Sequence, residues 1–168
     1  MIIIINGALG VGKTSVAEEL MRRFEKSVHL DGDHIGDVHP FEIYDEARIE
    51  HLYQTLAHLV RFHKDHGYPD FVINYVFESS ASLEQLLSLL RPLDDDIRVY
   101  WLTCNETEHA KRVQGRACVE LKWEMERFVE LRKIQSAAAL QGFIGVEVDT
   151  SGLNPGEVAD EIWGDIFD

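Results

Sequence analysis

The residues with the clearest chemistry lie near the N-terminus, where the glycine-rich segment 7–14 (Gly-Ala-Leu-Gly-Val-Gly-Lys-Thr) follows the apolar run 2–5. At this spacing, glycines let backbone N–H groups turn toward a phosphate, the lysine bridges β- and γ-phosphates, and the threonine hydroxyl ligates Mg²⁺. The pattern therefore predicts a nucleoside triphosphate site. The residues expected to hold the nucleotide are Gly7, Ala8, Leu9, Gly10, Val11, Gly12, Lys13, Thr14 and Ser15.

Two carboxylates, Asp31 and Asp33, follow a second apolar stretch in the sequence Leu30-Asp31-Gly32-Asp33-His34. Carboxylates two residues apart can divide the work of phosphoryl transfer. One holds Mg²⁺, directly or through water, and the other orients an acceptor hydroxyl or receives its proton. The same residues also suit an ordinary aspartate-glycine turn with solvated carboxylates. Their position after a phosphate-binding segment favours the first interpretation.

Apolar runs and helical periodicities alternate along the chain, which is typical of a mostly parallel sheet flanked by helices. The strands are predicted at residues 2–6, 27–31, 71–77, 97–103 and 144–148, and the helices near 13–25, 45–66, 81–91, 106–116, 122–139 and 156–167. The carboxyl ends of parallel strands meet at one edge of the sheet, where ligands bind in open α/β folds. We therefore expect the polar residues that follow each strand to gather at that edge.

Length and composition narrow the class of protein. The 168 residues suffice for one well-buried core, so we expect a single domain over residues 1–168. The net charge of −14 disfavours binding to nucleic acid polymers or anionic membranes, and we expect neither as a partner. No signal peptide or membrane span is expected, and Cys104 and Cys118 lack a ligand pattern, as in cytoplasmic proteins with reduced thiols. A monomer or a homodimer is expected.

The segment 7–14 followed by Leu30-Asp31-Gly32-Asp33 resembles the small P-loop kinases of metabolites and antibiotics: shikimate kinase, gluconate kinase, adenylylsulfate kinase, chloramphenicol phosphotransferase and the tunicamycin-resistance-like ATPases. The resemblance implies an α/β P-loop NTPase fold like that of nucleoside monophosphate kinases. Its five-stranded parallel sheet would have the order 2-3-1-4-5, with helices on both faces and a short lid. The resemblance further implies ATP and Mg²⁺, with Asp31 assisting the metal and Asp33 contacting or deprotonating the acceptor.

The lid of such kinases corresponds to residues 111–123. Residues 111–133 hold seven Lys or Arg and four Glu, a net charge of +3 in an otherwise acidic chain, which favours an anionic partner such as the triphosphate. Arg112 and Arg116 lie four apart, so both could offset charge on the transferring phosphoryl group from one helix face. Gly115 would let the lid close over the nucleotide. A solvated cationic helix face is the alternative for both arginines.

Acceptor recognition is expected between Asp33 and the end of the third predicted strand. The candidate residues are His34, His39, Phe41, Tyr44, Arg48, Asn74, Tyr75, Phe77 and Glu78. Their aromatic content suits a ring-bearing or partly apolar substrate. The alternation along residues 71–77 equally suits core packing of Phe71, Tyr75 and Phe77. The Arg-rich acceptor pocket expected of a shikimate kinase is missing, so the acceptor is left open.

Together these patterns predict an ATP- and Mg²⁺-dependent enzyme that transfers a phosphoryl group to a hydroxyl of a small molecule, either a metabolite, a nucleoside or nucleotide, or an antibiotic. The catalytic candidates are Lys13, Asp33, Arg112 and Arg116, and the metal ligands are Thr14 and Asp31. The alternative is a P-loop hydrolase or switch, with Glu78 as the water-activating carboxylate. A resistance or regulatory protein that binds nucleotide without a small-molecule acceptor is a further alternative.

Overall fold

The computed structural model describes residues 1–114 and 121–167. Its strands form a five-stranded parallel sheet in the order β2-β3-β1-β4-β5, as predicted. The strands are β1 (Ile2–Gly7), β2 (Ser27–Asp31), β3 (Asp70–Asn74), β4 (Ile97–Thr103) and β5 (Val146–Asp149). The helices are α1 (Lys13–Met21), α2 (Glu46–Asp65), α3 (Ser80–Leu90), α4 (Glu106–Gln114), α5 (Leu121–Gln141) and α6 (Pro155–Phe167).

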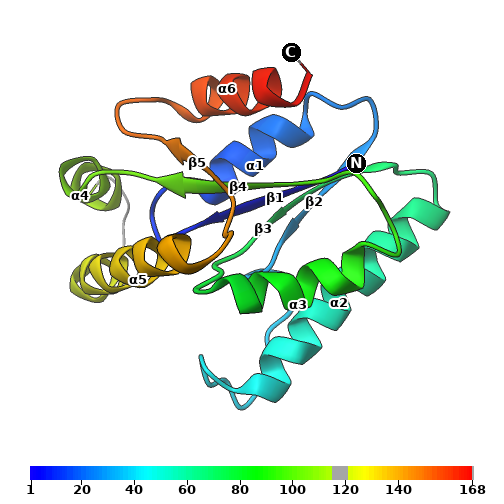
Figure 1. The fold of residues 1–168 in the computed structure, drawn as a ribbon, viewed down its shortest axis with the longest axis horizontal. Coiled ribbons are helices and arrows are strands. Elements are labelled where there is room, and N and C mark those ends of the chain that lie inside the picture. Colours follow the sequence, from blue (N-terminus) through cyan, green and yellow to red (C-terminus); the bar gives the residue numbers. More distant parts are fainter. Residues whose placement is uncertain (115–120, 168) are drawn as a thin grey trace.

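The isoleucine run of β1 lies at the centre of the sheet and is buried on both faces. Ile3 and Ile5 pack into the apolar cluster that includes α1 and α6, whereas Ile2 and Ile4 pack into the cluster that includes α2 and α3. A continuous apolar run is what a central parallel strand requires, since helices cover both of its sides. Figure 1 shows these two helical layers, with α4 and α5 beside the carboxyl ends of the strands. Within the described ranges, no helix has the length and apolarity to cross a membrane.

The third strand is shorter than the predicted range 71–77, because it ends at Asn74. The Tyr75 amide still donates to the Ile5 carbonyl at 3.2 Å, but the amide of Phe77 donates to the side-chain oxygen of Asn6 at 2.9 Å rather than to a backbone carbonyl of β1. The Phe77 ring remains fully buried. Its apolar character therefore reflects core packing beyond the strand, which a period-two pattern cannot distinguish from the strand itself. The other element bounds differ by less, apart from the first helix, which ends at Met21 instead of residue 25.

A buried polar network joins the start of the phosphate-binding loop to α5. Asn6 is fully buried, and its side chain accepts hydrogen bonds from the Gly7 and Phe77 amides and donates to the Ile144 carbonyl. Gln135 of α5, also buried, donates to Asn6 Oδ1 and to the Phe77 carbonyl, both at 3.0 Å, and accepts from the Trp101 indole at 3.2 Å. Because buried polar groups are costly when unpaired, this network fixes α5 against the carboxyl ends of β1 and β3.

Candidate active site

The loop between β1 and α1 has the backbone of an anion cradle. Gly12 caps α1 with φ of 102°, a left-handed conformation that suits glycine, and no side chain occupies the cap. Gly10, at φ of 77°, packs so closely that an added Cβ would lie 2.6 Å from His109 Nε2. The first amides of a helix have no acceptor within the helix, and the helix dipole favours negative charge beside them. Residues 7–15 therefore have the backbone geometry that the predicted phosphate site requires.

Lys13 lies folded within this loop rather than extended into solvent. Its side chain is only 7% exposed, and Nζ donates to the Ala8 carbonyl at 3.1 Å. The next residues, Thr14 and Ser15, are exposed at the start of α1. The ammonium is thus held beside the loop by a contact with the protein's own backbone. Such preorganisation reduces the free energy that ordering a long side chain would cost on phosphate binding.

Thr14 and Asp31 form an oxygen-rich pair that fits a magnesium ion. The Thr14 hydroxyl donates to Asp31 Oδ2 at 2.9 Å, and the Asp33 amide donates to Asp31 Oδ1 at 2.9 Å. Burial opposes ionisation of Asp31, yet the hydrogen bonds from Asn74, from the Asp33 amide and from Thr14 outweigh it and hold the Asp31 pKa below its ordinary value. A hydroxyl and an ionised carboxylate are hard oxygen donors, which Mg²⁺ prefers.

Asn74 supports this pair and does not lie on the acceptor side, where the sequence placed it. Its side chain is buried, with Nδ2 at 3.5 Å from Thr14 Oγ1, and its Oδ1 contacts the Nε2 of His29. His34 lies on the other side, with Nδ1 at 3.3 Å from Asp31 Oδ2. The end of β3 therefore contacts the Thr14–Asp31 pair of α1 and β2, because neighbouring parallel strands end at the same edge.

Asp33 faces a cavity of about 770 Å³ that extends from the phosphate loop to α2 and α5. The Asp33 residue is exposed to solvent, although neighbouring groups of the cavity wall partly desolvate its carboxylate. This partial desolvation raises the pKa of Asp33 above its ordinary value; the nearby charge of Lys13 opposes the shift and that of Asp31 adds to it. A carboxylate of raised basicity, adjacent to the phosphate lysine, is suited to receive a proton from a ligand in the cavity.

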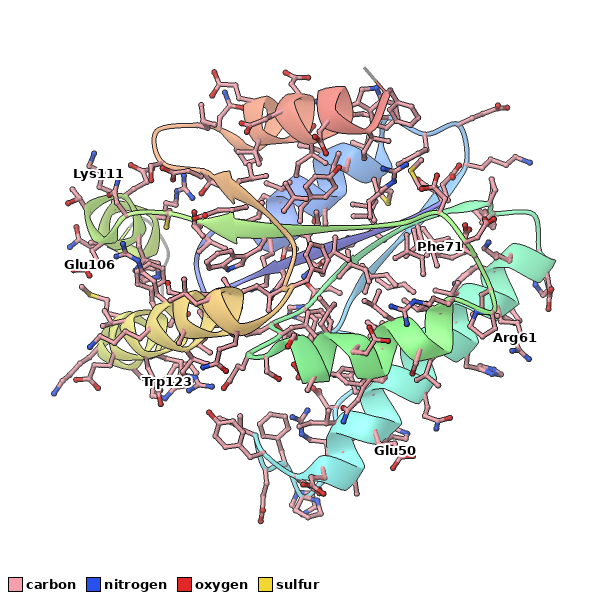
Figure 2. The ribbon with its side chains drawn as sticks, viewed as in Figure 1. Glu50, Arg61, Phe71, Glu106, Lys111 and Trp123 are labelled. Carbon is pink, nitrogen blue, oxygen red and sulfur yellow. The ribbon has the colours of Figure 1, made fainter. Side chains whose placement is uncertain are left out.

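Aromatic side chains from several elements line this cavity: Phe41, Tyr44, Tyr53, Tyr75 and Trp123. Of the candidates named from the sequence, Arg48 and Glu78 also line it, whereas His34 and His39 are exposed residues outside the lining and Phe77 is buried in the core. Trp123 lies on the edge of α5 that faces the segment before α2 (Figure 2). The cavity therefore combines the predicted acceptor region with one wall, from α5, that the sequence did not assign.

Arg127 is the second residue of α5 at the cavity that the sequence did not assign, and it lies three positions before Glu130. The two side chains form an ion pair at 2.7 Å, but Arg127 is only 12% exposed and also binds Glu78 Oε1 at 2.6 Å. Desolvation lowers the pKa of this guanidinium, and contacts with Glu130, Tyr44 and Glu78 more than reverse the effect. The positive charge of residues 111–133 was the available signal, but it did not specify which cation reaches the cavity.

Arg112, on α4, contacts a backbone carbonyl of the phosphate loop. Its guanidinium donates to the Val11 carbonyl at 3.0 Å and to the Thr150 hydroxyl and carbonyl at 2.9 and 2.6 Å, while Glu108 pairs with its Nε at 3.1 Å. Arg112 thus joins α4, the phosphate loop and the loop after β5. The second predicted lid arginine, Arg116, and Gly115 lie outside the described residues.

The sheet order, the glycine-rich loop and the Thr14–Asp31 pair define a P-loop nucleoside triphosphate-binding protein with a kinase-like topology. Residues 3–128 match the family model described as "AAA domain", and the chain belongs to that family. No curated protein matches the chain. Solved structures do match, and they include the families that the two sequence motifs resemble.

The tunicamycin resistance protein of Deinococcus radiodurans is 22% identical with a TM-score of 0.67, and the match covers 99% of this chain and 95% of that one. A shikimate kinase from Aquifex aeolicus is 21% identical with a TM-score of 0.60, over 99% and 96% of the two chains. A gluconokinase from Sinorhizobium meliloti is 15% identical with a TM-score of 0.63, over 95% and 87%. These similarities establish the fold and place the chain among proteins built like small-molecule kinases.

Proposed function

We propose that the protein transfers the γ-phosphoryl group of ATP to a hydroxyl of a small molecule, in a reaction that depends on Mg²⁺. The observation that carries the proposal is the position of Asp33. This carboxylate lies between the lysine of the phosphate loop and a cavity large enough for an acceptor. A hydrolase needs room for a water molecule alone, whereas a cavity of about 770 Å³ is in the range that holds a drug-sized ligand.

The chain's residues divide the reaction between them. Thr14 and Asp31 would hold Mg²⁺, which neutralises phosphate charge when bound. The loop amides and Lys13 bind the β- and γ-phosphates and stabilise the charge that the leaving ADP acquires. Asp33 accepts the proton of the acceptor hydroxyl as the new oxygen–phosphorus bond forms and the bond to the β-phosphate oxygen breaks. The products are the phosphorylated acceptor and ADP, and the proton leaves from Asp33 to solvent.

Glu78, which the sequence offered as a water-activating carboxylate, is less suited to that role. It is bound by Arg127 at 2.6 Å and lies 3.5 Å from the Tyr44 hydroxyl. Its Oε1 atom is thus already engaged by the guanidinium, which leaves less of the carboxylate to bind and orient a water molecule. These contacts favour transfer over hydrolysis, and the Mg²⁺ and acceptor requirements are the properties to measure.

The test is Mg²⁺-dependent ADP release from ATP across hydroxylated metabolites, nucleosides and antibiotics, each against an acceptor-free blank. The proposal expects one class to stimulate release and to yield a phosphorylated product by mass spectrometry. Asp33→Asn should retain ATP affinity and lose at least about 100-fold in transfer, the usual contribution of a general base, whereas Lys13→Ala should weaken ATP use itself. If ADP release were equal with and without every acceptor, the activity would be ATP hydrolysis and not phosphoryl transfer.

A further inference from the structure

We infer that the acceptor is an uncharged, ring-bearing hydroxyl compound of drug-like size, such as a nucleoside or an aryl glycoside, and that the cavity discriminates against anionic acceptors. This inference rests on the proposed function and deepens it by naming the substrate class. It follows from four properties of the cavity: its size, its aromatic lining, the contacts already made by its arginines and the net charge of its lining.

The size of the cavity exceeds the need of a single small sugar or sugar acid. Ligand pockets of about 300–1,000 Å³ hold molecules of drug size, and this cavity measures about 770 Å³. Part of its lining is apolar, from Ile35, Ile49 and Leu52 among others. A ligand that fills it must therefore bring apolar surface as well as the hydroxyl that reaches Asp33.

The aromatic side chains at the cavity are arranged to receive a ring. Phe41 and Tyr44, in the segment before α2, are 62% and 63% exposed, and Trp123 of α5 is 47% exposed. Tyr53 and Tyr75 meet edge to face at 6.2 Å deeper in the same lining. Large aromatic rings left in water at the mouth of a cavity gain free energy when a ligand ring stacks on them. Rings from two separate elements can enclose one ligand ring between them.

Within the described part of the chain, two arginines line the cavity, and both are already engaged by the protein. Arg48 donates to the carbonyls of Glu42 and Ile43 at 2.8 and 2.7 Å, and its guanidinium lies 4.8 Å from the Phe41 ring centroid. Arg127 binds two carboxylates, those of Glu78 and Glu130. An anionic acceptor would have to displace these contacts, and it would leave a carboxylate without its partner.

The remaining charges of the cavity repel anions. Among the described residues of the lining, three are acidic, Asp33, Asp37 and Glu78, and two are arginines. The formal balance of these lining residues is therefore −1, and the phosphates of ATP would offset the positive charge of Lys13 beside Asp33. Like charges in a partly desolvated site repel each other more strongly than they do in water. A phosphate or carboxylate on the acceptor is thus disfavoured by both the field and the occupied arginines, whereas a neutral ring is not.

Binding to the full chain, with its nucleotide site filled by Mg²⁺ and a non-hydrolysable ATP analogue, tests the inference apart from catalysis. Calorimetry would compare phenyl β-glucoside with methyl β-glucoside, which lacks the ring, and with phenyl β-glucuronide, which adds a carboxylate. Uridine and its 5′-monophosphate form a second pair. We expect the neutral ring-bearing member of at least one set to bind at least about tenfold more tightly than its counterparts, a difference of about 1.4 kcal/mol. Equal or tighter binding of the anions, or no preference in either set, would overturn it.

The variant Glu78→Gln tests the role of the occupied arginine. It removes the ion pair between Glu78 and Arg127. The ratio of the affinities for phenyl glucoside and phenyl glucuronide, or for uridine and its monophosphate, should therefore shrink about fivefold or more. Glu84→Gln is the matched control, because Glu84 pairs with Arg91 on α3, outside this cavity. An unchanged ratio of these affinities in Glu78→Gln contradicts the inference. Selective binding of a neutral ligand without phosphoryl transfer would instead sustain the cavity assignment and refute the proposed function.

Discussion

Replacing Gln135 with leucine tests whether the buried polar network holds α5 in place. The substitution keeps the approximate volume of the side chain and removes three hydrogen bonds: to Asn6 Oδ1, to the Phe77 carbonyl and from the Trp101 indole. Asn6 Oδ1 keeps the Gly7 and Phe77 amides as donors. The Trp101 N–H and the Phe77 carbonyl lose the Gln135 side chain in the interior of the protein.

The expected loss of unfolding free energy follows from these two groups, which are left without the hydrogen bonds that Gln135 made. A buried donor or acceptor left unsatisfied costs about 1–3 kcal/mol, so Gln135→Leu is expected to lose about 2–6 kcal/mol of unfolding free energy. This is a large part of the roughly 5–15 kcal/mol that stabilises a typical domain. For a chain of this size, each kcal/mol shifts Tm by about 2–4 °C, so the midpoint should fall by about 4–24 °C.

Urea unfolding followed by tryptophan fluorescence, together with thermal unfolding by circular dichroism, would measure the loss. Gln141→Leu is the matched control, since Gln141 ends the same helix and is exposed; its change should stay within about 0.5 kcal/mol. A Gln135→Leu protein within that same limit would refute the claim that these hydrogen bonds fix α5. Acceptor-site binding should weaken alongside stability, because α5 carries Trp123 and Arg127.

Three further predictions concern the nucleotide side. Arg112→Met removes contacts to the Val11 and Thr150 carbonyls, so we expect ATP affinity by calorimetry to fall about tenfold, with Lys111→Met unchanged. Thr14→Val keeps the side-chain shape but removes the hydroxyl, so the Mg²⁺ concentration for half-maximal ADP formation should rise at least about tenfold, the scale of one lost metal contact. Asp33→Asn should raise Tm at pH 7, because the raised pKa of Asp33 in the folded state means that its ionised form destabilises the fold. The gain in Tm should vanish below the ordinary pKa of 3.8, where Asp33 is protonated in both states. A fall in Tm at pH 7 would contradict this prediction.

The sequence was informative where function depends on local spacing. The phosphate loop is one contiguous segment, and the end of β2 brings Asp31 within 2.9 Å of the Thr14 hydroxyl, an arrangement compatible with the metal assignment, which stays a prediction. The sheet order was also correct. It came from the resemblance to known kinases, since periodicity identifies strands without ordering them.

The α5 wall of the cavity could not be predicted in the same way. Gln135 is a polar residue in a helix with no clear apolar face, so pattern reasoning places it in solvent, whereas the structure buries it against Asn6. That contact spans 129 positions in the sequence. Trp123 and Arg127 lie on the helix that makes this contact, and no local signal reports a contact of this range.

The assignment of different roles to Asp31 and Asp33 has a physical basis that can be tested without measuring activity. The two carboxylates lie two residues apart, yet their pKa values shift in opposite directions. Hydrogen bonds outweigh burial at Asp31 and lower its pKa, whereas desolvation raises the pKa of Asp33 and the charge of Asp31 adds to the rise. Environments that separate two pKa values in this way are typical of a fixed anion beside a proton acceptor.

It follows that Asp31→Asn should lower the pKa of Asp33, because it removes a neighbouring negative charge. A titration of the Asp33 carboxyl carbon by NMR would measure this shift directly, and the acid limb of kcat/KM should move to lower pH at saturating Mg²⁺. Asp37→Asn, in the same cavity lining, serves as the control for a general loss of charge. If the pKa of Asp33 were unchanged or higher in Asp31→Asn, the two carboxylates would not be coupled, and the division of labour between them would lose its electrostatic basis.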